Sequence, residues 1–356
     1  MVQPIDSLLA FRFSQKDCGS LEQKILLHPR GIDAWELILR SAATMQKYEL
    51  SERELSIWAE KQPQQLQDYI QQRKVIYQRR DFRFCGLTKN SPFIMGIVNV
   101  TPDSFSDGGD FLLPDTAIRK GLALMGEGAD IIDVGGESTK PGAIEVSPEE
   151  EMRRILPVIE GLASVGALVS VDTRHGQTME AAIKAGAKIV NDISALTDDA
   201  DALNIIQKYE DVSIILMHKQ GQPKTMQNEY HYHHVVLDVY DYLLKRVQIC
   251  EQAGIERSRL SVDAGIGFGK SVQHNLDLMG RLSLFKSLGC SVTLGASRKS
   301  FIAAVSRDVP PKERLCGSLA AALWAVSQKV GILRVHDVGE TKQALDVWLS
   351  IQNAGY

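Results

Sequence analysis

The chain has 356 residues, of which 44% are hydrophobic and 24% are charged, and its formal net charge is −4. This length accommodates one large domain and an appendage, and the slightly acidic balance argues against nonspecific nucleic-acid binding, which requires clustered positive charge. No apolar stretch approaches the ~20 residues of a membrane-spanning helix, and the first residues lack the pattern of a signal peptide, so we expect a cytoplasmic protein without membrane contact.

Residues 1–80 differ from the rest of the chain, because they are rich in Gln, Leu, Glu and Arg and show no catalytic pattern. Apolar residues at helical spacing around Trp35 and Tyr69 predict several short helices, and Ser51 followed by Glu54 is typical of a capping box. We interpret the polar run 62–80 as the solvent-facing side of a helix. The expected organisation is a mainly helical extension, 1–80, for which docking, dimer formation and a passive capping role remain open.

A regular alternation of short apolar runs and helical stretches begins at residue 92, after a predicted hairpin within 81–90. The expected strands are 93–98, 131–134, 168–171, 188–190, 213–216, 260–262, 291–294 and 332–335. The expected helices are 115–126, 148–162, 176–184, 200–209, 233–253, 272–287, 312–328 and 339–352. Eight strands alternating with eight helices predict an α/β fold, a (β/α)8 TIM barrel, over residues 81–356. A doubly wound open sheet is the alternative, but the loop after Asn99 lacks the spacing of a dinucleotide-binding turn.

A polar or charged group follows each expected strand, where the strand would open into the mouth of a barrel. These groups are Asn99, Asp133, Asp172, Asn191, His218, Asp263, Lys299, Arg334 and His336. Taken alone, each has a structural explanation: Asp172 as a helix cap, Asn191 as a turn residue and His218 as a semi-buried structural histidine. Independent capping would not fill every strand exit, so we predict one shared site.

The chemistry of this predicted site suits a flat heterocycle that carries a phosphorylated tail. Its carboxylates and amides accept hydrogen bonds from ring N–H and amino groups, while Lys299 supplies donors. The cationic groups after the last two strands suit a phosphorylated leaving group. They are Arg298, Lys299, Arg334 and His336. Asn99 offers an uncharged oxygen for Mg²⁺, which normally completes its shell with phosphates and waters.

From about residue 81 to the C-terminus, the chain resembles the dihydropteroate synthase family. The resemblance is carried by segments 95–109, 132–142, 170–173, 191–193, 216–227, 263–270, 297–300 and 334–337. Members of this family join 6-hydroxymethyl-7,8-dihydropterin pyrophosphate to p-aminobenzoate, releasing pyrophosphate, and are targets of sulfonamide drugs. The resemblance implies a TIM barrel, Mg²⁺ as cofactor, the two small-molecule substrates and a homodimer.

The resemblance also implies a role for individual residues. Those implied to hold the pterin are Asp172, Asn191, Ile193, Met217, Asp263, Phe268 and Lys299. Those implied to bind pyrophosphate are Asn99, through Mg²⁺, with Thr139, Lys140, Arg334 and His336. Those implied to border p-aminobenzoate are Phe105, Thr139, Pro141, Phe268, Lys299 and Ser300. The implied catalytic residues are Asp172, Asp107 and Lys299, acting in a mechanism in which pyrophosphate leaves first and a cation forms on the pterin methylene group.

Three positions depart from the usual family pattern: Lys140 replaces an Arg, Lys219 a Met and Ala264 a Pro. None of the three removes a residue on which the predicted chemistry depends. Two other functions are compatible with the pterin-binding residues, namely a corrinoid-linked pterin methyltransferase barrel and a non-catalytic pterin-binding barrel. The loop 101–109 and the pair Arg334 and His336 favour the synthase, because neither alternative requires a pyrophosphate site.

Overall fold

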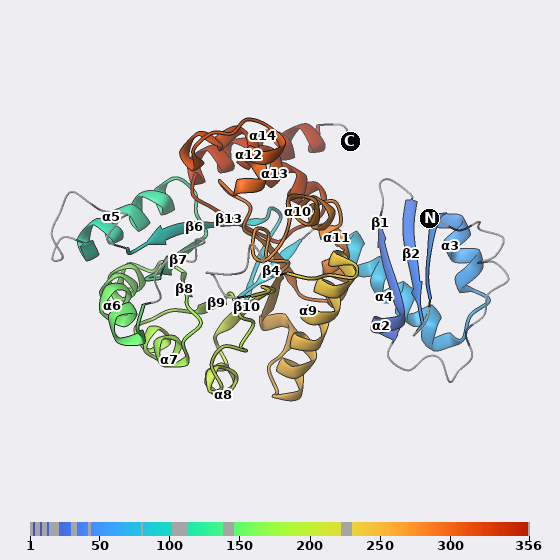
Figure 1. Ribbon diagram of the computed structural model, residues 1–356, viewed down its shortest axis with the longest axis horizontal. Coiled ribbons are helices and arrows are strands. Elements are labelled where there is room, and N and C mark those ends of the chain that lie inside the picture. Colours follow the sequence, from blue (N-terminus) through green and yellow to red (C-terminus); the bar gives the residue numbers. More distant parts are fainter. Residues whose placement is uncertain are drawn as a thin grey trace. The chain divides into compact units, whose positions relative to one another are not determined.

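The computed structural model describes residues 3, 8, 13, 21–29, 34–41, 44–79, 81–101, 113–137, 146–221 and 230–354. The chain divides into two compact units (Figure 1). The N-terminal unit comprises Met1–Arg80 and the short segment Ser283–Gly289, and the barrel unit comprises Asp81–Leu282 and Cys290–Tyr356. The later segment therefore groups with the N-terminal unit, although the sequence placed it inside the barrel domain.

The N-terminal unit contains an antiparallel sheet in the order β1-β2-β3, which the expectation of a mainly helical extension did not include. Its elements are α2 (Leu21–Lys24), β1 (Ile25–Pro29), β2 (Ala34–Arg40), β3 (Met45–Ser51), α3 (Glu52–Ala59) and α4 (Gln64–Gln78). The residues that form the core of this unit recur at every second position, as in Trp35, Leu37 and Leu39, although Ile38 between them is also buried. This period of two is typical of a strand with one face on a core, and it overrode the helical interpretation of the same residues.

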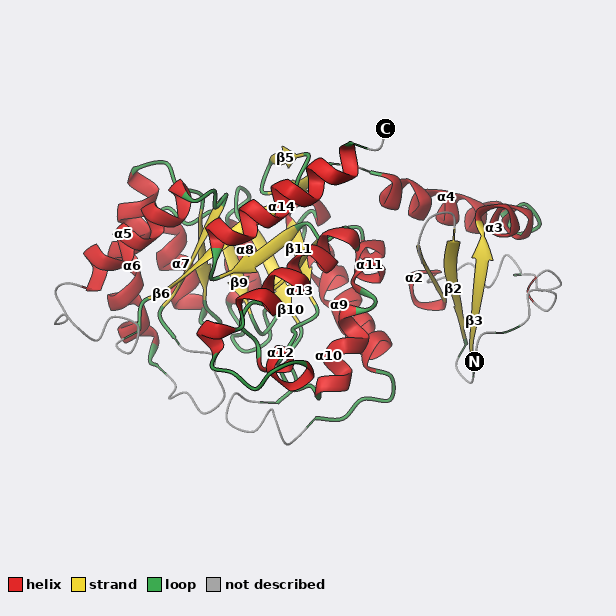
Figure 2. Cartoon of the chain, turned by 90° about the horizontal axis from the view of Figure 1, so that it is seen from above, coloured by secondary structure: helices red, strands yellow, loops and turns green. Residues whose placement is uncertain are grey.

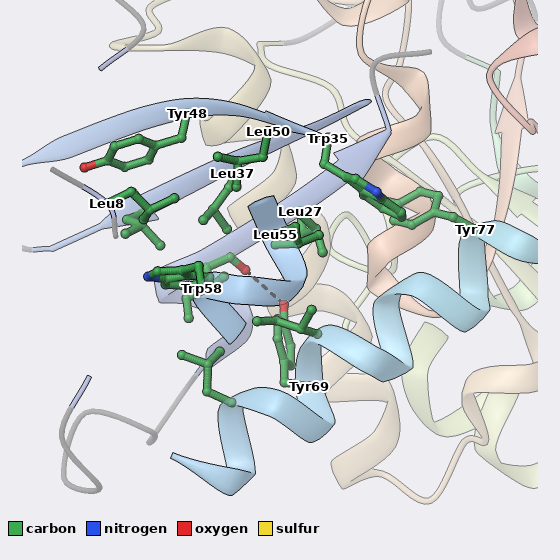
Figure 3. Packing of buried hydrophobic residues seen from close by; sticks show 14 residues of the cluster. Leu8, Leu27, Trp35, Leu37, Tyr48, Leu50, Leu55, Trp58, Tyr69 and Tyr77 are labelled. Atoms are coloured by element: carbon green, nitrogen blue, oxygen red, sulfur yellow. Dashed lines mark hydrogen bonds between the residues drawn. The ribbon is translucent and has the colours of Figure 1, made fainter. Parts of the chain in front are cut away.

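Helices α3 and α4 supply the other side of this core (Figure 3). Ser51 and Glu54 form the predicted capping box at the start of α3. The Tyr69 hydroxyl donates a 2.9 Å hydrogen bond to the carbonyl oxygen of Ile25, which ties α4 to β1. The run 62–80 is not simply solvent-facing, because Arg73 and Lys74 are buried. Lys74 pairs with Glu52, and Arg73 donates to the Ser287 carbonyl.

The barrel unit is a closed eight-stranded parallel barrel, which confirms the predicted fold. Its strands are β6 (Phe93–Asn99), β7 (Ile131–Gly135), β8 (Val169–Asp172), β9 (Ile189–Asp192), β10 (Ser213–Met217), β11 (Leu260–Asp263), β12 (Ser291–Leu294) and β13 (Ile332–Val335). They follow one another around the barrel in chain order, and β13 pairs with β6 to close it. All eight strands lie where the apolar runs predicted them.

Helices surround this barrel (Figure 2). They are α5 (Leu113–Gly126), α6 (Pro148–Ser164), α7 (Gly176–Lys184), α8 (Ala202–Lys208), α9 (Val235–Gln252), α10 (Val272–Met279), α11 (Leu282–Phe285), α12 (Ser300–Val305), α13 (Leu315–Ser327) and α14 (Val338–Asn353). Short 3₁₀ turns are η4 (Arg257–Arg259), η5 (Lys286–Leu288) and η6 (Pro311–Glu313). The helix expected over 272–287 is interrupted at Gly280, which caps α10. Every helix in the described residues is too short or too polar to cross a membrane.

The predicted hairpin precedes the barrel and closes its amino-terminal end. It consists of β4 (Phe82–Phe84) and β5 (Leu87–Lys89). Phe84 packs against residues from the starts of several strands, including Phe93, Ile131 and Ile332. We call this cluster the floor of the barrel. Alternate residues of a barrel strand point inward, so residues farther along the same strands face the opposite opening.

Candidate active site

The carboxyl ends of the strands meet at the opening opposite the floor, which we call the mouth. Neighbours at the ends of β6 to β9 are Asn99, Gly135, Asp172 and Asn191. Met217 and Asp263 are paired in the same way at the ends of β10 and β11. The structure therefore brings to one opening the polar strand ends that the sequence placed far apart in the chain.

Arg334, from β13, reaches into the mouth and pairs with two carboxylates. Its Nε donates to Oδ2 of Asp133 and its Nη2 donates to Oδ2 of Asp172, both at 2.6 Å. The same Asp133 oxygen accepts a 3.1 Å hydrogen bond from Nδ2 of Asn191. These four residues form a continuous network that links β7, β8, β9 and β13.

Asp133 is the member of this network to which sequence analysis assigned no binding role. It is completely buried and lies two residues before the end of β7. A signal was available, because Asp133 is a lone carboxylate inside the apolar run Ile131–Gly135, and a buried charge requires partners. The sequence could not identify those partners, since Arg334 lies 201 positions away.

Burial in the mouth changes the protonation of Asp172. Removal from water raises the pKa of Asp172 to about 7, while the nearby Arg334 guanidinium opposes this rise and the Asp133 carboxylate adds to it. Burial also raises the pKa of Asp263, against the attraction of Lys299 and Lys270. The mouth therefore holds carboxylates whose pKa values are raised by burial. A cationic ligand nearby would lower these pKa values and so stabilise the charged forms.

The loop after β11 carries a second group of predicted residues. Asp263 accepts a 2.7 Å hydrogen bond from the Gly265 amide through Oδ1. The Lys299 ammonium donates to the Ile266 carbonyl at 2.5 Å and lies 4.1 Å from the centre of the Phe268 ring. Burial lowers the pKa of Lys299 to about 8. Lys299, which follows β12, therefore lies against Phe268 on this loop, as expected of residues that share a ligand.

Lys270, which is buried, donates hydrogen bonds to the backbone of this loop. Its ammonium donates to the carbonyls of Gly265 and Phe268 at 2.9 Å, and lies 3.0 Å from Nδ1 of His218. Burial lowers the pKa of Lys270 to about 7, and burial next to Lys270 holds the pKa of His218 well below its usual value. His218 is therefore a neutral, buried acceptor, in agreement with its expected structural role.

Glycine is required at position 265, where the chain passes close to the His218 backbone. Its φ is +68°, and a side-chain carbon there would lie 1.9 Å from the His218 carbonyl oxygen. Any larger residue would displace the backbone on which Asp263 and Lys299 depend.

The corner after β12 and β13 carries less positive charge than the sequence suggested. Arg298 is paired with Asp337 through Nε, at 3.0 Å, and through Nη2. Burial and the adjacent guanidinium groups of Arg334 and Arg298 lower the pKa of His336 to about 3. His336 is therefore a neutral imidazole at physiological pH, 3.1 Å from the Ser297 hydroxyl. Of the cationic groups expected at this corner, Arg298 and Arg334 are paired with carboxylates, and the partners of Arg334 come from other strands of the barrel.

Comparison with known proteins shows the family to which this chain belongs. Residues 95–336 match the pterin binding enzyme family. Dihydropteroate synthase of Haemophilus influenzae is 46% identical over 264 residues, covering 74% of this chain and 95% of that protein. The chain belongs to the dihydropteroate synthase family.

Two solved structures of this family illustrate the match. The Xanthomonas albilineans synthase with 4-aminobenzoic acid has a TM-score of 0.71 and 43% identity, covering 77% of this chain and 98% of that one. The Yersinia pestis synthase in a sulfonamide drug complex has a TM-score of 0.71 and 39% identity, covering 77% and 99%. The pterin binding match begins at residue 95, so residues 1–80 lie outside it.

Three of the remaining predicted site residues lie in the described part of the chain, after β9, at the end of β10 and after β12. Ile193 and Met217 are buried apolar residues, and Ser300 is exposed at the start of α12. Phe105, Asp107, Thr139, Lys140 and Pro141 lie outside the described residues. Of the departures from the family pattern, Ala264 is buried and Lys219 pairs with Asp198 at 2.5 Å.

Proposed function

We propose that this chain condenses 6-hydroxymethyl-7,8-dihydropterin pyrophosphate with p-aminobenzoate, giving 7,8-dihydropteroate and pyrophosphate, at the barrel mouth. The observation that carries the assignment is the convergence of acceptors and donors on one opening, in a chain that aligns with nearly the full length of known synthases. That near-complete alignment favours the synthase over the methyltransferase and the non-catalytic barrel.

The hydrogen bonds already made in the mouth define which atoms remain for the pterin. Asn191 donates its Nδ2 to Asp133, so its Oδ1 remains to accept. Asp263 uses Oδ1 for the Gly265 amide, which leaves Oδ2. Two acceptors and the Lys299 ammonium match a heterocycle edge with ring N–H, amino and carbonyl groups. Ile193, Met217 and Phe268 would pack on the faces of the ring.

The proposed reaction begins with departure of pyrophosphate, which leaves a cation on the pterin methylene carbon. The carboxylates of Asp172 and Asp107 would stabilise this cation electrostatically. The aromatic amine of p-aminobenzoate is a weak nucleophile, so attack on a preformed cation suits it better than direct displacement. Exclusion of water would protect the cation from hydrolysis.

The leaving group would be received by Arg334 and His336, with Thr139 and Lys140. Two Arg334 donors are already held by Asp133 and Asp172, which fixes the guanidinium in the mouth before substrate arrives. His336, being neutral, would act as a hydrogen-bond partner rather than as a charge. The binding of pyrophosphate by these residues would therefore depend on positioned donors more than on net positive charge.

Magnesium fits this arrangement as a partner of the substrate. The described residues contain no cluster of three His, Cys, Asp or Glu side chains suited to a metal, which leaves the neutral Asn99 oxygen as the candidate ligand from the protein. Mg²⁺ commonly takes one or two protein oxygens and completes its shell with phosphates and waters. When bound, it would neutralise charge on the departing pyrophosphate.

p-Aminobenzoate would bind at the outer side of the mouth, near Phe268 and Lys299. The other residues proposed to border it are Phe105, Thr139, Pro141 and Ser300. A sulfonamide would compete at the same place, because it shares the arylamine of this substrate.

We also propose that the protein acts in the cytoplasm as a homodimer. Val347 and Ile351 lie four residues apart on α14 and are 55% and 69% exposed, which gives that helix an apolar strip suited to a second copy. Sedimentation equilibrium of the full chain tests this, and a monomer at micromolar concentration would contradict it.

The decisive assay measures pyrophosphate release with and without p-aminobenzoate. A synthase releases pyrophosphate with p-aminobenzoate and forms dihydropteroate in equal amount. A non-catalytic pterin-binding barrel would release none under either condition. A corrinoid-linked methyltransferase would also release none, and would instead transfer a methyl group from a methylated pterin to a corrinoid.

A further inference from the structure

Asp133 is central to the mouth, yet it cannot reach a ligand at the surface of the site. It is 0% exposed, and its Oδ2 accepts from both Asn191 and Arg334. Its neighbour in the strand register is Ser170 on β8, which is also completely buried. Asp133 therefore lies one step beneath the residues proposed to hold the pterin.

The chemistry of the Asp133–Asn191 pair determines which way the Asn191 amide points. An ionised carboxylate can only accept hydrogen bonds, so the amide must present its nitrogen to Asp133 and its oxygen to the mouth. A neutral acceptor-and-donor group in place of Asp133 would permit either orientation. The carboxylate charge is also required by Arg334, whose Nε lies 2.6 Å from the same oxygen.

We propose that Asp133 is a positioning residue for pterin recognition: it fixes the Asn191 amide with its oxygen toward the ligand and holds Arg334 against Asp172. This inference rests on the proposed function, because it assigns a cause to the acceptor that Asn191 offers the pterin. It adds a requirement for an acid at a position that touches no substrate.

The test compares three variants by calorimetric titration with 6-hydroxymethylpterin. In Asp133→Asn the Asn191 amide loses its fixed orientation. In Asn191→Asp two carboxylates face each other. Each of these single variants should bind 6-hydroxymethylpterin more than tenfold more weakly than the wild type. In the double variant Asp133→Asn/Asn191→Asp, the new amide donates to the new carboxylate, which again offers an acceptor to the ligand. The double variant should bind at least fivefold better than the weaker single variant.

Ser170→Ala is the matched control, since it alters a fully buried neighbour of Asp133 without touching the network. It should bind the pterin within twofold of the wild type. In all variants that turn over, KM for p-aminobenzoate should stay within threefold of the wild-type value, because Asn191 and Arg334, the partners of Asp133, are not among the residues proposed to border that substrate. Circular dichroism melts accompany each titration.

Two outcomes would overturn the inference: pterin affinity of Asp133→Asn within twofold of wild type, or a double variant no better than the weaker single one. If Asp133→Asn does not fold, the comparison of Asn191→Asp with the double variant decides the question. Measurements on the wild-type protein separate failure of the proposed function from failure of this inference. If the proposed function is wrong, the wild type will neither bind the pterin nor form dihydropteroate.

Discussion

The floor and the mouth of the barrel are built from the same eight strands but differ in the side chains that fill them. The floor is closed by apolar side chains, with Phe84 inserted among the starts of the strands. The mouth instead holds the buried carboxylates Asp133 and Asp263 and the partly buried carboxylate Asp172 around Arg334 and Lys299. Burial of apolar surface stabilises a fold, whereas burial of charge is unfavourable unless the charge is paired and hydrogen-bonded, so buried charge is more typical of sites for binding or catalysis. Substitutions at the two ends should therefore separate stability from activity.

The largest expected effect is on turnover, from Asp172→Asn in the mouth. The substitution keeps the side-chain shape but removes the charge proposed to stabilise the cation, so kcat should fall by roughly 10²–10⁴-fold. The free energy of unfolding should change by less than about 2 kcal/mol, because Arg334 still pairs with Asp133.

The measurement is steady-state dihydropteroate formation beside a urea unfolding curve. Asp211→Asn is the control, since its carboxylate precedes β10 at the other end of the barrel and is 66% exposed. Turnover of Asp172→Asn within threefold of wild type would reject the catalytic role of this residue.

The opposite result is expected at the floor, from Phe84→Ala. Phe84 is 2% exposed, and removal of a buried phenyl ring destabilises a core by about 3–5 kcal/mol. The kcat of the folded fraction should stay within about twofold, because the ring lies at the opposite end of the strands from the mouth.

Chemical unfolding and a turnover assay well below the melting temperature check this pair of expectations. Leu87→Ala, on the other arm of the hairpin and 46% exposed, should cost less than about 1 kcal/mol. A large loss of kcat in fully folded Phe84→Ala would remove the distinction between the two ends of the barrel.

The two regions also differ in how far they could be predicted from the sequence. Strand positions and the polar strand ends followed from local patterns, because each apolar run and the group after it are contiguous. The charge state of the mouth did not follow from local patterns, since Asp172 and Arg334 are 162 positions apart and His336 is kept neutral by burial beside the Arg334 and Arg298 guanidinium groups. The N-terminal sheet was missed because apolar residues around Trp35 fit two periods, and only packing selected the period of two.

Buried charge in the mouth should make activity depend on pH in both directions. Asp172 must be ionised to stabilise a cation, and its pKa is raised to about 7, so activity should fall as pH decreases below about 7. Lys299 must be protonated to donate, and its pKa is lowered to about 8, so activity should fall as pH increases above about 8. A narrow bell-shaped profile of kcat/KM is expected, falling about tenfold per pH unit outside these limits.

Lys299→Arg sharpens this prediction, because a guanidinium stays protonated throughout the accessible range. The alkaline limb should disappear from its profile while the acidic limb remains near pH 7. A flat wild-type profile between pH 5 and 10 would show that neither group limits the reaction.

The rim of the mouth is intermediate between its buried interior and the solvent, and an ion-pair chain runs along it. Lys219 pairs with Asp198 at 2.5 Å, Arg174 reaches Asp198 at 3.5 Å, and Arg174 pairs with Glu137 at 3.3 Å. These residues follow β7, β8, β9 and β10 in turn, so the chain links four neighbouring strand exits. The Lys219 side chain is only 9% exposed.

Lys219→Met, which restores the usual family residue, should therefore have the smallest effect. Loss of one partly shielded ion pair should lower the free energy of unfolding by about 0.5–1 kcal/mol and leave kcat within about twofold. Lys342→Met is the matched control, because its pair with Asp346 is equally short but 42% and 56% exposed, and it should cost nothing measurable. The difference between the two variants should persist in 1 M salt, because a partly buried ion pair is screened much less than an exposed one. Equal losses of unfolding free energy in the two variants at low salt would mean that the ion pairs of the rim contribute no more than ordinary surface pairs. The network around Arg334 would then be the part of the mouth in which charge matters for function.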